Sequence, residues 1–207
     1  MKPLSLLIAG AGMCLMFACG SGTGSSDSVD SAKSANDSTM GAMKDSSSMM
    51  KDSSASSPQY STGPVDKDDA NFAVDAANGG MTEIAASQVA QNSASSQRIK
   101  DFAAMMVQDH TKAGDELKKL AAAKSITLPS AISDKNQKEV DGLGKKTGAD
   151  FDKAYVKLML DDHKGAVDLF KKESDKAKDA DIKTFATKTL PTLEMHLDSI
   201  KAIAGKK

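Results

Sequence analysis

The sequence predicts an all-α protein whose folded part is an antiparallel four-helix bundle. Its composition suits helices: tryptophan is absent and only 4% of the residues are aromatic, whereas strands favour aromatic and β-branched residues. From Val65 onward, apolar residues recur at spacings of three and four, the period of a helix with one buried face. Four such segments follow one another, and most of their connections are short, which is typical of an antiparallel bundle.

Residues 1–18 are typical of a bacterial secretory signal peptide. Lys2 is followed by an apolar run that is too short to span a bilayer as a mature helix. Met16, Ala18 and Cys19 resemble the lipobox of bacterial lipoproteins, although leucine is more usual than methionine at the first of these positions. We therefore expect cleavage before Cys19 and a lipid on its thiol and its new amino group. The alternative is an ordinary signal peptide with a cysteine there by chance.

Residues 19–64 join this expected anchor to the helical domain, which occupies residues 65–207. The segment after Cys19 consists mainly of Ser, Asp, Gly, Lys, Ala and Met, so it cannot bury enough surface to offset the entropy of ordering. We expect a disordered tether with a root-mean-square reach of roughly 35–40 Å. Because Cys14 leaves with the signal peptide and Cys19 carries lipid, packing alone must stabilise the mature chain.

The first long helix is expected over residues 66–92. An aspartate at its start can cap it, and acidic residues in its first turn suit the helix dipole. Glu83 interrupts the apolar stripe of this helix. Gly79 and Gly80 lie inside it at a cost of roughly 1 kcal/mol each, which indicates either a kink or the close approach of a neighbouring helix.

The second long helix is expected over residues 95–124, and a shorter helix over residues 134–143 in the one longer connection. The third long helix is expected over residues 150–178. The fourth begins near residue 179 and continues beyond Pro191, where we expect a kink because proline removes a helical hydrogen bond.

All three histidines of the chain fall on or beside the apolar stripes, as His110, His163 and His196 of the second, third and fourth long helices. With Glu83, each long helix has one such polar residue near its middle. At 1.5 Å per residue, these positions reach a common depth whichever way each helix runs. We therefore expect the four side chains to converge in the interior. The residues expected as their outer partners are Asp109, Asp162, Glu194 and Tyr155.

Buried imidazoles and a buried carboxylate are costly unless they are hydrogen-bonded, paired or bound to metal. Three histidines and a glutamate can hold one Fe, Zn, Mn or Cu ion in a four- or five-coordinate site. The alternative is a metal-free polar network in which Glu83 accepts from the histidines, Tyr155 joins, and the helix register is fixed. The spacing does not decide between the two. A third interpretation, a solvated helix edge, applies best to His196, because Leu197 competes for the inward direction.

Specific motifs accompany these residues. They are Gly-Gly-Met-x-Glu at 79–83, Phe-x6-Asp-His at 102–110, Phe-Asp-x-x-Tyr and Asp-His-Lys within 151–164, and Leu-Pro-x-Leu-x-x-His at 190–196. With these motifs, residues 66–204 closely resemble the DUF4142 family. The resemblance implies a bacterial secreted or outer-membrane-associated protein with a ferritin-like four-helix bundle.

A ferritin-like bundle suggests a carboxylate-bridged di-metal centre, but such centres use Glu-x-x-His on two helices. Here Val107, Leu160 and Leu193 stand three residues before the histidines, so ferroxidase or oxygenase chemistry is not supported. The sequence also contains no nucleophile elbow, phosphate-binding loop or second carboxylate pair. An enzyme is therefore the least favoured class of function.

The sequence predicts a lipoprotein of the bacterial cell envelope whose helical bundle binds one transition-metal ion through its Glu/His cluster. The alternative is a metal-free structural or protein-interaction module of the envelope. A formal net charge of −1 without a basic face argues against nucleic acid as a partner. The expected membrane contact is the lipid anchor, and Gly20, rather than Asp, after Cys19 favours the outer over the inner membrane. The protein partner and the substrate are not identified by the sequence.

Overall fold

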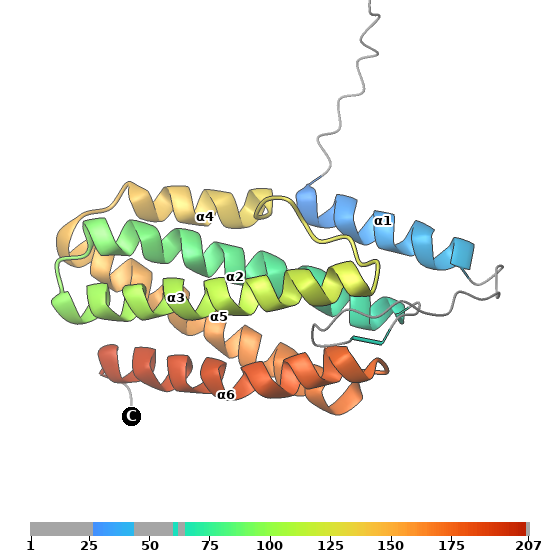
Figure 1. The fold of residues 1–207 in the computed structure, drawn as a ribbon. Coiled ribbons are helices and arrows are strands. Elements are labelled where there is room, and N and C mark those ends of the chain that lie inside the picture. The colour runs from blue at the N-terminus through green and yellow to red at the C-terminus, as the bar shows by residue number, and fades with distance from the viewer. Residues whose placement is uncertain (1–26, 44–59, 62–64, 206–207) are drawn as a thin grey trace, which may run out of the picture.

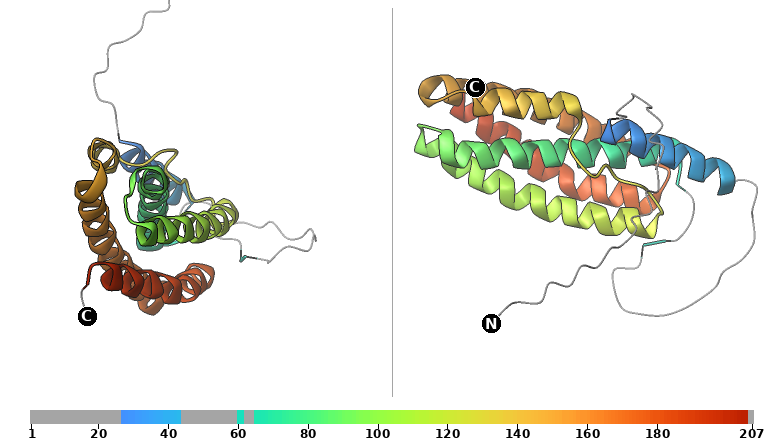
Figure 2. Two further views of the ribbon diagram at one scale, coloured as in Figure 1. Left: turned by 90° about the vertical axis from the view of Figure 1, so that its left-hand side faces the viewer. Right: turned by 90° about the horizontal axis from the view of Figure 1, so that it is seen from above.

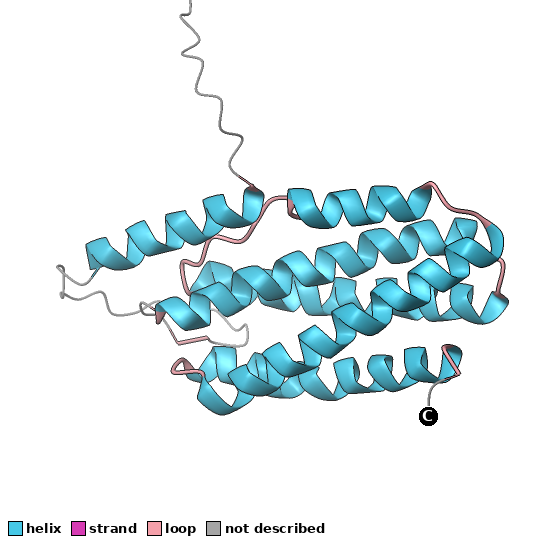
Figure 3. Ribbon diagram, turned by 180° about the vertical axis from the view of Figure 1, so that it is seen from behind, coloured by secondary structure: helices cyan, strands magenta, loops and turns pink. Residues whose placement is uncertain are grey.

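A computed structural model describes residues 27–43, 60–61 and 65–205. Over these residues the chain forms six α-helices and no strand (Figures 1 and 3). They are α1 (Ser28–Met43), α2 (Lys67–Ser93), α3 (Gln97–Ala123), α4 (Asp134–Gly144), α5 (Gly148–Lys176) and α6 (Ala180–Ile203). The predicted all-α class is confirmed. No helix in this described part is both long and apolar enough to cross a bilayer.

The four long helices form two antiparallel pairs that pack against each other (Figures 1 and 2). Helix α2 lies along α3, and α5 lies along α6; the pairs are joined because α2 also contacts α5, and α3 contacts α6. The shorter α4 packs against α2 and α5, and α1 packs against α2. The arrangement places the middles of α2, α3, α5 and α6 around one interior.

Local side-chain chemistry sets several helix ends. Asp66, Ser133 and Asp179 precede α2, α4 and α6, and each accepts a hydrogen bond from a backbone N–H of the first helical turn. Just after α3, Ser125 adopts a φ of 55°, the left-handed conformation that commonly closes a helix. These local signals explain why the boundaries lie close to those expected from the sequence.

The interior contains two apolar clusters, one toward each end of the bundle. The α2–α3-turn core includes Phe102, Phe151 and Met159. The α5–α6-turn core includes Phe72, Leu120, Phe170 and Phe185. Full burial of each such side chain contributes roughly 1.5–3 kcal/mol, so the two cores supply the main driving force for folding. Along the helices, Glu83 and the histidines fall between the residues of the two cores.

Helix α1 corrects the expectation that residues 19–64 form a disordered tether. Ser28–Met43 is helical and packs on α2 with Ala32 buried. Asn36 is 2% exposed and makes two hydrogen bonds to the backbone of Thr127, donating to its carbonyl at 3.0 Å and accepting from its N–H at 2.7 Å. These long-range polar contacts fix the helix, and apolar periodicity along the sequence does not reveal them.

Residues 1–26, 44–59, 62–64 and 206–207 lie outside the described residues. The signal peptide, the lipidation of Cys19 and the remainder of the tether fall there and stay predictions. The division of the chain into three parts stays a prediction as well.

Pro191 and the pair Gly79–Gly80, where the sequence indicates a distortion, do not end the helices that contain them. Pro191 lies within α6, and Gly79 and Gly80 lie within α2. A Cβ added to Gly79 would meet no described atom within 4 Å, and one added to Gly80 would come within 3.8 Å of Nδ1 of His110. That second distance is an ordinary van der Waals contact. The close approach of a neighbouring helix therefore does not explain the glycine pair.

Candidate metal centre

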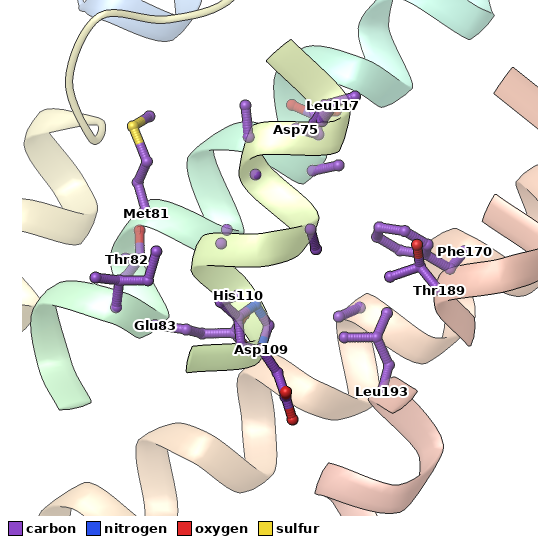
Figure 4. Close-up of a pocket in the computed structure, with 18 of the residues that line it drawn as sticks. Asp75, Met81, Thr82, Glu83, Asp109, His110, Leu117, Phe170, Thr189 and Leu193 are labelled. Atoms are coloured by element: carbon purple, nitrogen blue, oxygen red, sulfur yellow. The ribbon is translucent and has the colours of Figure 1, made fainter. Parts of the chain in front are cut away.

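Glu83, His110, His163 and His196, called the histidine cluster below, come from α2, α3, α5 and α6 and meet between the two cores. Their exposed fractions are 3%, 7%, 0% and 0%. Glu83 Oε2 lies 3.2 Å from Nδ1 of His110, and Glu83 Oε1 lies 3.2 Å from Nδ1 of His163. Figure 4 shows the side chains of Glu83 and His110 pointing toward each other. Four polar side chains thus occupy one buried layer.

The three imidazole rings form a triangle. Their centroids are 5.3 Å apart for His110 and His196, 5.4 Å for His163 and His196, and 5.8 Å for His110 and His163. Each ring offers a nitrogen within 4.8 Å of those of the other two. A tetrahedral zinc ion with bonds of about 2.05 Å holds its nitrogen ligands roughly 3.3 Å apart. The rings would therefore move together by about 1–1.5 Å on binding such an ion.

One nitrogen of each ring faces an oxygen atom. Nδ1 of His163 donates to the Met159 carbonyl at 2.9 Å, Nε2 of His196 donates to Oδ2 of Asp109 at 3.0 Å, and Nδ1 of His110 contacts Glu83. The opposite nitrogens, Nε2 of His110, Nε2 of His163 and Nδ1 of His196, are buried without a hydrogen-bond partner among the described residues. In metal-ligating histidines, likewise, an oxygen partner at one ring nitrogen fixes the tautomer and leaves the lone pair of the other nitrogen for the ion.

Burial sets the charge of the cluster. Together with the charge of neighbouring imidazoles, burial lowers the pKa of His110 to about 3 and that of His163 to about 4. It also lowers the pKa of His196, although Asp109 opposes that shift. Burial, assisted by Asp162, raises the pKa of Glu83 well above its ordinary value. All three rings are therefore neutral at pH 7, the form in which imidazole binds metals.

With this geometry established, comparison with known proteins identifies the family. The sequence profile of DUF4142, a domain of unknown function, matches residues 54–203, well over half of the chain. The chain belongs to the DUF4142 family. The crystal structure of a DUF305 fragment from Deinococcus radiodurans is similar, with a TM-score of 0.61 and 13% sequence identity over 69% of this chain and 99% of the fragment. At that identity the likeness shows the helical fold alone. No curated protein matches the chain.

Asp109 and Glu194, two acidic residues expected beside the histidines, do not both contact a histidine in this DUF4142 domain. Asp109 pairs with His196 of the neighbouring helix, and not with the adjacent His110. Glu194 is exposed, and two residues along a helix correspond to about 200° of rotation, so it points away from His196. The expectation that Glu194 supports His196 is therefore wrong, and Asp109 occupies that place.

Tyr155 and Asp162 lie near the cluster but make no hydrogen bond to its histidines within the described structure. The Tyr155 hydroxyl lies 2.8 Å from Oγ of Ser87, and burial raises the pKa of Tyr155. Oδ2 of Asp162 is buried without a partner among the described residues, and burial raises the pKa of this carboxyl to about 6. Asp162 affects the cluster through its charge, which acts on Glu83.

Sequence reasoning missed the contacts of Ser87 and Met159. Met159 lies four residues before His163, a separation at which a side chain can reach the carbonyl of the preceding helical turn. Ser87 lies four residues after Glu83 and shares its face of α2. Both spacings are usable signals for residues that orient a buried site.

Proposed function

We propose that this DUF4142 domain binds one transition-metal ion, Fe, Zn, Mn or Cu, through His110, His163 and His196, and that Glu83 leaves its contacts with Nδ1 of His110 and Nδ1 of His163 to become the fourth ligand. The observation that supports this is the set of three buried ring nitrogens that lack a partner among the described residues. Each unpartnered buried acceptor costs about 1–3 kcal/mol, and a bound cation would remove that cost for all three at once. Neutral imidazoles with one carboxylate suit these divalent ions.

Elemental analysis tests the proposal. Protein purified without chelators is expected to contain about one equivalent of metal, because the site has a single set of ligands. His163→Ala removes a ligand and is expected to lose the ion, whereas Lys118→Ala, at an exposed position of α3, keeps it. Circular dichroism verifies that both variants are folded. Metal-free wild-type protein that takes up no ion when each candidate metal is added would refute the site.

One observation favours the alternative, a metal-free interaction or structural module. Glu83 already lies 3.2 Å from both His110 and His163, so a carboxyl group can hold these rings together without an ion. The two candidates differ in their response to EDTA. The metal site predicts a lower melting temperature after chelation, and the metal-free module predicts no change.

We also propose that the domain is carried in the bacterial cell envelope by a lipid on Cys19, at the outer membrane in preference to the inner one. The support is the lipobox-like sequence around Cys19. Metabolic labelling with a radioactive fatty acid tests it: Cys19→Ser is expected to remove the label, and Cys14→Ser to retain it. Equal labelling of the two variants would contradict the assignment.

We infer that the four long helices form a ferritin-like bundle. The support is their packing as two antiparallel pairs. The chemistry differs from that of di-metal ferritin-like proteins, because Val107, Leu160 and Leu193 occupy the positions where a Glu-x-x-His motif would place a carboxylate. A single ion is the stoichiometry that these ligands support.

A further inference from the structure

A cavity adjoins the histidine cluster. Its volume is about 520 Å³, far more than a single ion needs and within the range of sites for organic ligands. Apolar side chains of the α5–α6-turn core form much of its wall, namely Leu117, Phe170, Phe185 and Leu193. Glu83, His110 and His196 line it as well. Figure 4 shows Glu83 and His110 on one side of this space, and Phe170 and Leu193 on another.

Glycines inside two helices keep this cavity open. Gly79, Gly80 and Gly114 all line it, and a glycine in a helix interior costs about 1 kcal/mol relative to alanine. A Cβ at Gly79 or Gly114 would meet no described atom within 4 Å, so the packing of neighbouring helices does not require glycine there. Larger side chains at these positions would instead extend into or narrow the cavity.

The polar side of the cavity presents hydrogen-bond acceptors. Oε1 of Glu83, Nε2 of His110 and Oδ2 of Asp162 are buried without hydrogen-bond partners in the described part of the chain. Among the described residues that line the cavity, Lys118 is the one lysine or arginine; its side chain is 71% exposed and pairs with Asp115 at 3.3 Å. A ligand that satisfies the buried acceptors must therefore donate hydrogen bonds, and a positive charge on it would complement the carboxylates.

We propose that the cavity binds a small organic ammonium ion, with its apolar body against Leu117, Phe170 and Leu193 and its ammonium group beside Glu83 and Asp162. This ligand goes beyond the metal ion and does not depend on it. The carboxylates of Asp109 and Asp162 line the polar side, so this side favours a cation when no metal ion is bound. An anionic head group would meet these carboxylates and find no buried lysine or arginine among the described lining residues.

Calorimetric titration of the full chain with octylammonium, octanoate and octanol tests the charge preference, at concentrations below those at which they form micelles. The three probes share an alkyl chain and differ in the head group. Octylammonium is expected to bind at least tenfold more tightly than octanoate in EDTA. Equal or tighter binding of octanoate, or no binding of octylammonium, would overturn the proposal. Because the titration in EDTA contains no metal, failure of the metal site leaves this result interpretable.

Three variants test the location. Gly114→Leu fills the cavity and is expected to abolish octylammonium binding while retaining the metal content of the wild type. The matched control is Gly165→Leu, at an exposed position of α5 where a Cβ also meets no described atom within 4 Å; it is expected to bind octylammonium as the wild type does. Asp162→Asn, measured in EDTA, is expected to reduce the affinity for octylammonium to about that for octanol. Wild-type octylammonium binding by Gly114→Leu would exclude this cavity as the site.

Discussion

Two polar clusters, a partly buried one and a fully buried one, lie at different levels of the same bundle, and they differ in how completely their atoms are paired. The bundle-end cluster, near the α5–α6 turn, consists of Ser61, Asp69, Lys124, Glu173, Asp179 and Asp181. In it, Nζ of Lys124 contacts Asp179 at 2.6 Å, Asp181 at 2.8 Å and Ser61 at 2.7 Å. Asp69 accepts hydrogen bonds from the backbone N–H groups of residues 178 and 179.

The histidine cluster is more deeply buried, and four of its acceptor atoms have no hydrogen-bond partner within the described structure. In the bundle-end cluster, Oε1 of Glu173 is the one described side-chain atom that is buried without a partner. A paired cluster joins chain segments and needs nothing more. An unpaired cluster is costly unless something else binds to it. The contrast is the physical basis for assigning structure to one cluster and ligand binding to the other.

The largest expected effect comes from a substitution that breaks the bundle-end cluster. Lys124→Met leaves Asp179 and Asp181 facing each other without their cation, and we expect a loss of about 3 kcal/mol in the free energy of unfolding. Urea denaturation measures this loss. Lys118→Met, at a side chain that is 71% exposed, is the control and is expected to change stability by less than about 0.5 kcal/mol. A loss as small as that of the control would show that the bundle-end cluster does not stabilise the fold.

Metal addition sharpens the contrast between the clusters. At a free zinc concentration about 100-fold above its dissociation constant, the free energy of unfolding is expected to rise by about 2.7 kcal/mol, because only the folded state holds the ligands together. Lys124→Met is expected to show the same increment from a lower starting value, and His163→Ala none. Differential scanning fluorimetry with and without zinc measures the shifts. A zinc response that persists in His163→Ala would place the ion elsewhere.

Glu173, whose Oε1 is the atom of the bundle-end cluster without a partner, predicts that the free energy of unfolding depends on pH. Burial, with the charge of Asp69, raises the pKa of Glu173 from its ordinary value of 4.5 to about 7. The folded state thus holds this proton more tightly than the unfolded chain. Protonation of Glu173 therefore stabilises the folded state fully below pH 4.5, and this stabilisation is lost as the pH rises to about 7.

Glu173→Gln removes this titration. We expect the variant to exceed the wild type by about 1 kcal/mol at pH 8, a value reduced for solvent screening at the end of the bundle, and to match it near pH 5. Denaturation at the two pH values measures the difference. The same difference in the free energy of unfolding between Glu173→Gln and the wild type at both pH values would contradict the raised pKa of Glu173.

The smallest expected effect concerns a pair next to the histidine cluster. Tyr155→Phe removes the hydroxyl that lies 2.8 Å from Oγ of Ser87, which is expected to cost about 1 kcal/mol because the serine loses its partner. In a protein that already carries Ser87→Ala, Tyr155→Phe is expected to lower the free energy of unfolding by less, because the hydroxyl no longer has this partner. The metal content is expected to stay that of the wild type, since neither residue is a ligand. Loss of the metal in Tyr155→Phe would make this pair part of the site.

The positions of the helices and the meeting of the polar residues are the parts of this structure that local patterns predict. Glu83, His110, His163 and His196 stand on periodic apolar stripes near the middle of their helices, and helix geometry brings such positions to one depth. The role of these residues as metal ligands remains a prediction.

Interactions between helices account for what sequence reasoning missed. Asp109 pairs with His196, 87 positions away, because of how α3 rotates against α6. The spacing within α6 does not predict this, which is why Glu194 was the wrong choice. Helix α1 is fixed by Asn36 and the backbone of Thr127, 91 positions away, and not by an apolar stripe. The cavity at Gly79 and Gly114 depends on the distance between helices, a quantity absent from any single helical pattern.

If Cys19 carries the proposed lipid, the docking of α1 limits how far the domain can stand from a membrane. Between Cys19 and the first residue of α1, Ser28, an extended chain spans at most about 30 Å, whereas the full connection to Val65 could span roughly 150 Å. A lipid at Cys19 would therefore hold the bundle within a few nanometres of the bilayer while α1 stays in place. Release of α1 from α2 would extend that standoff several-fold without any change in the bundle itself.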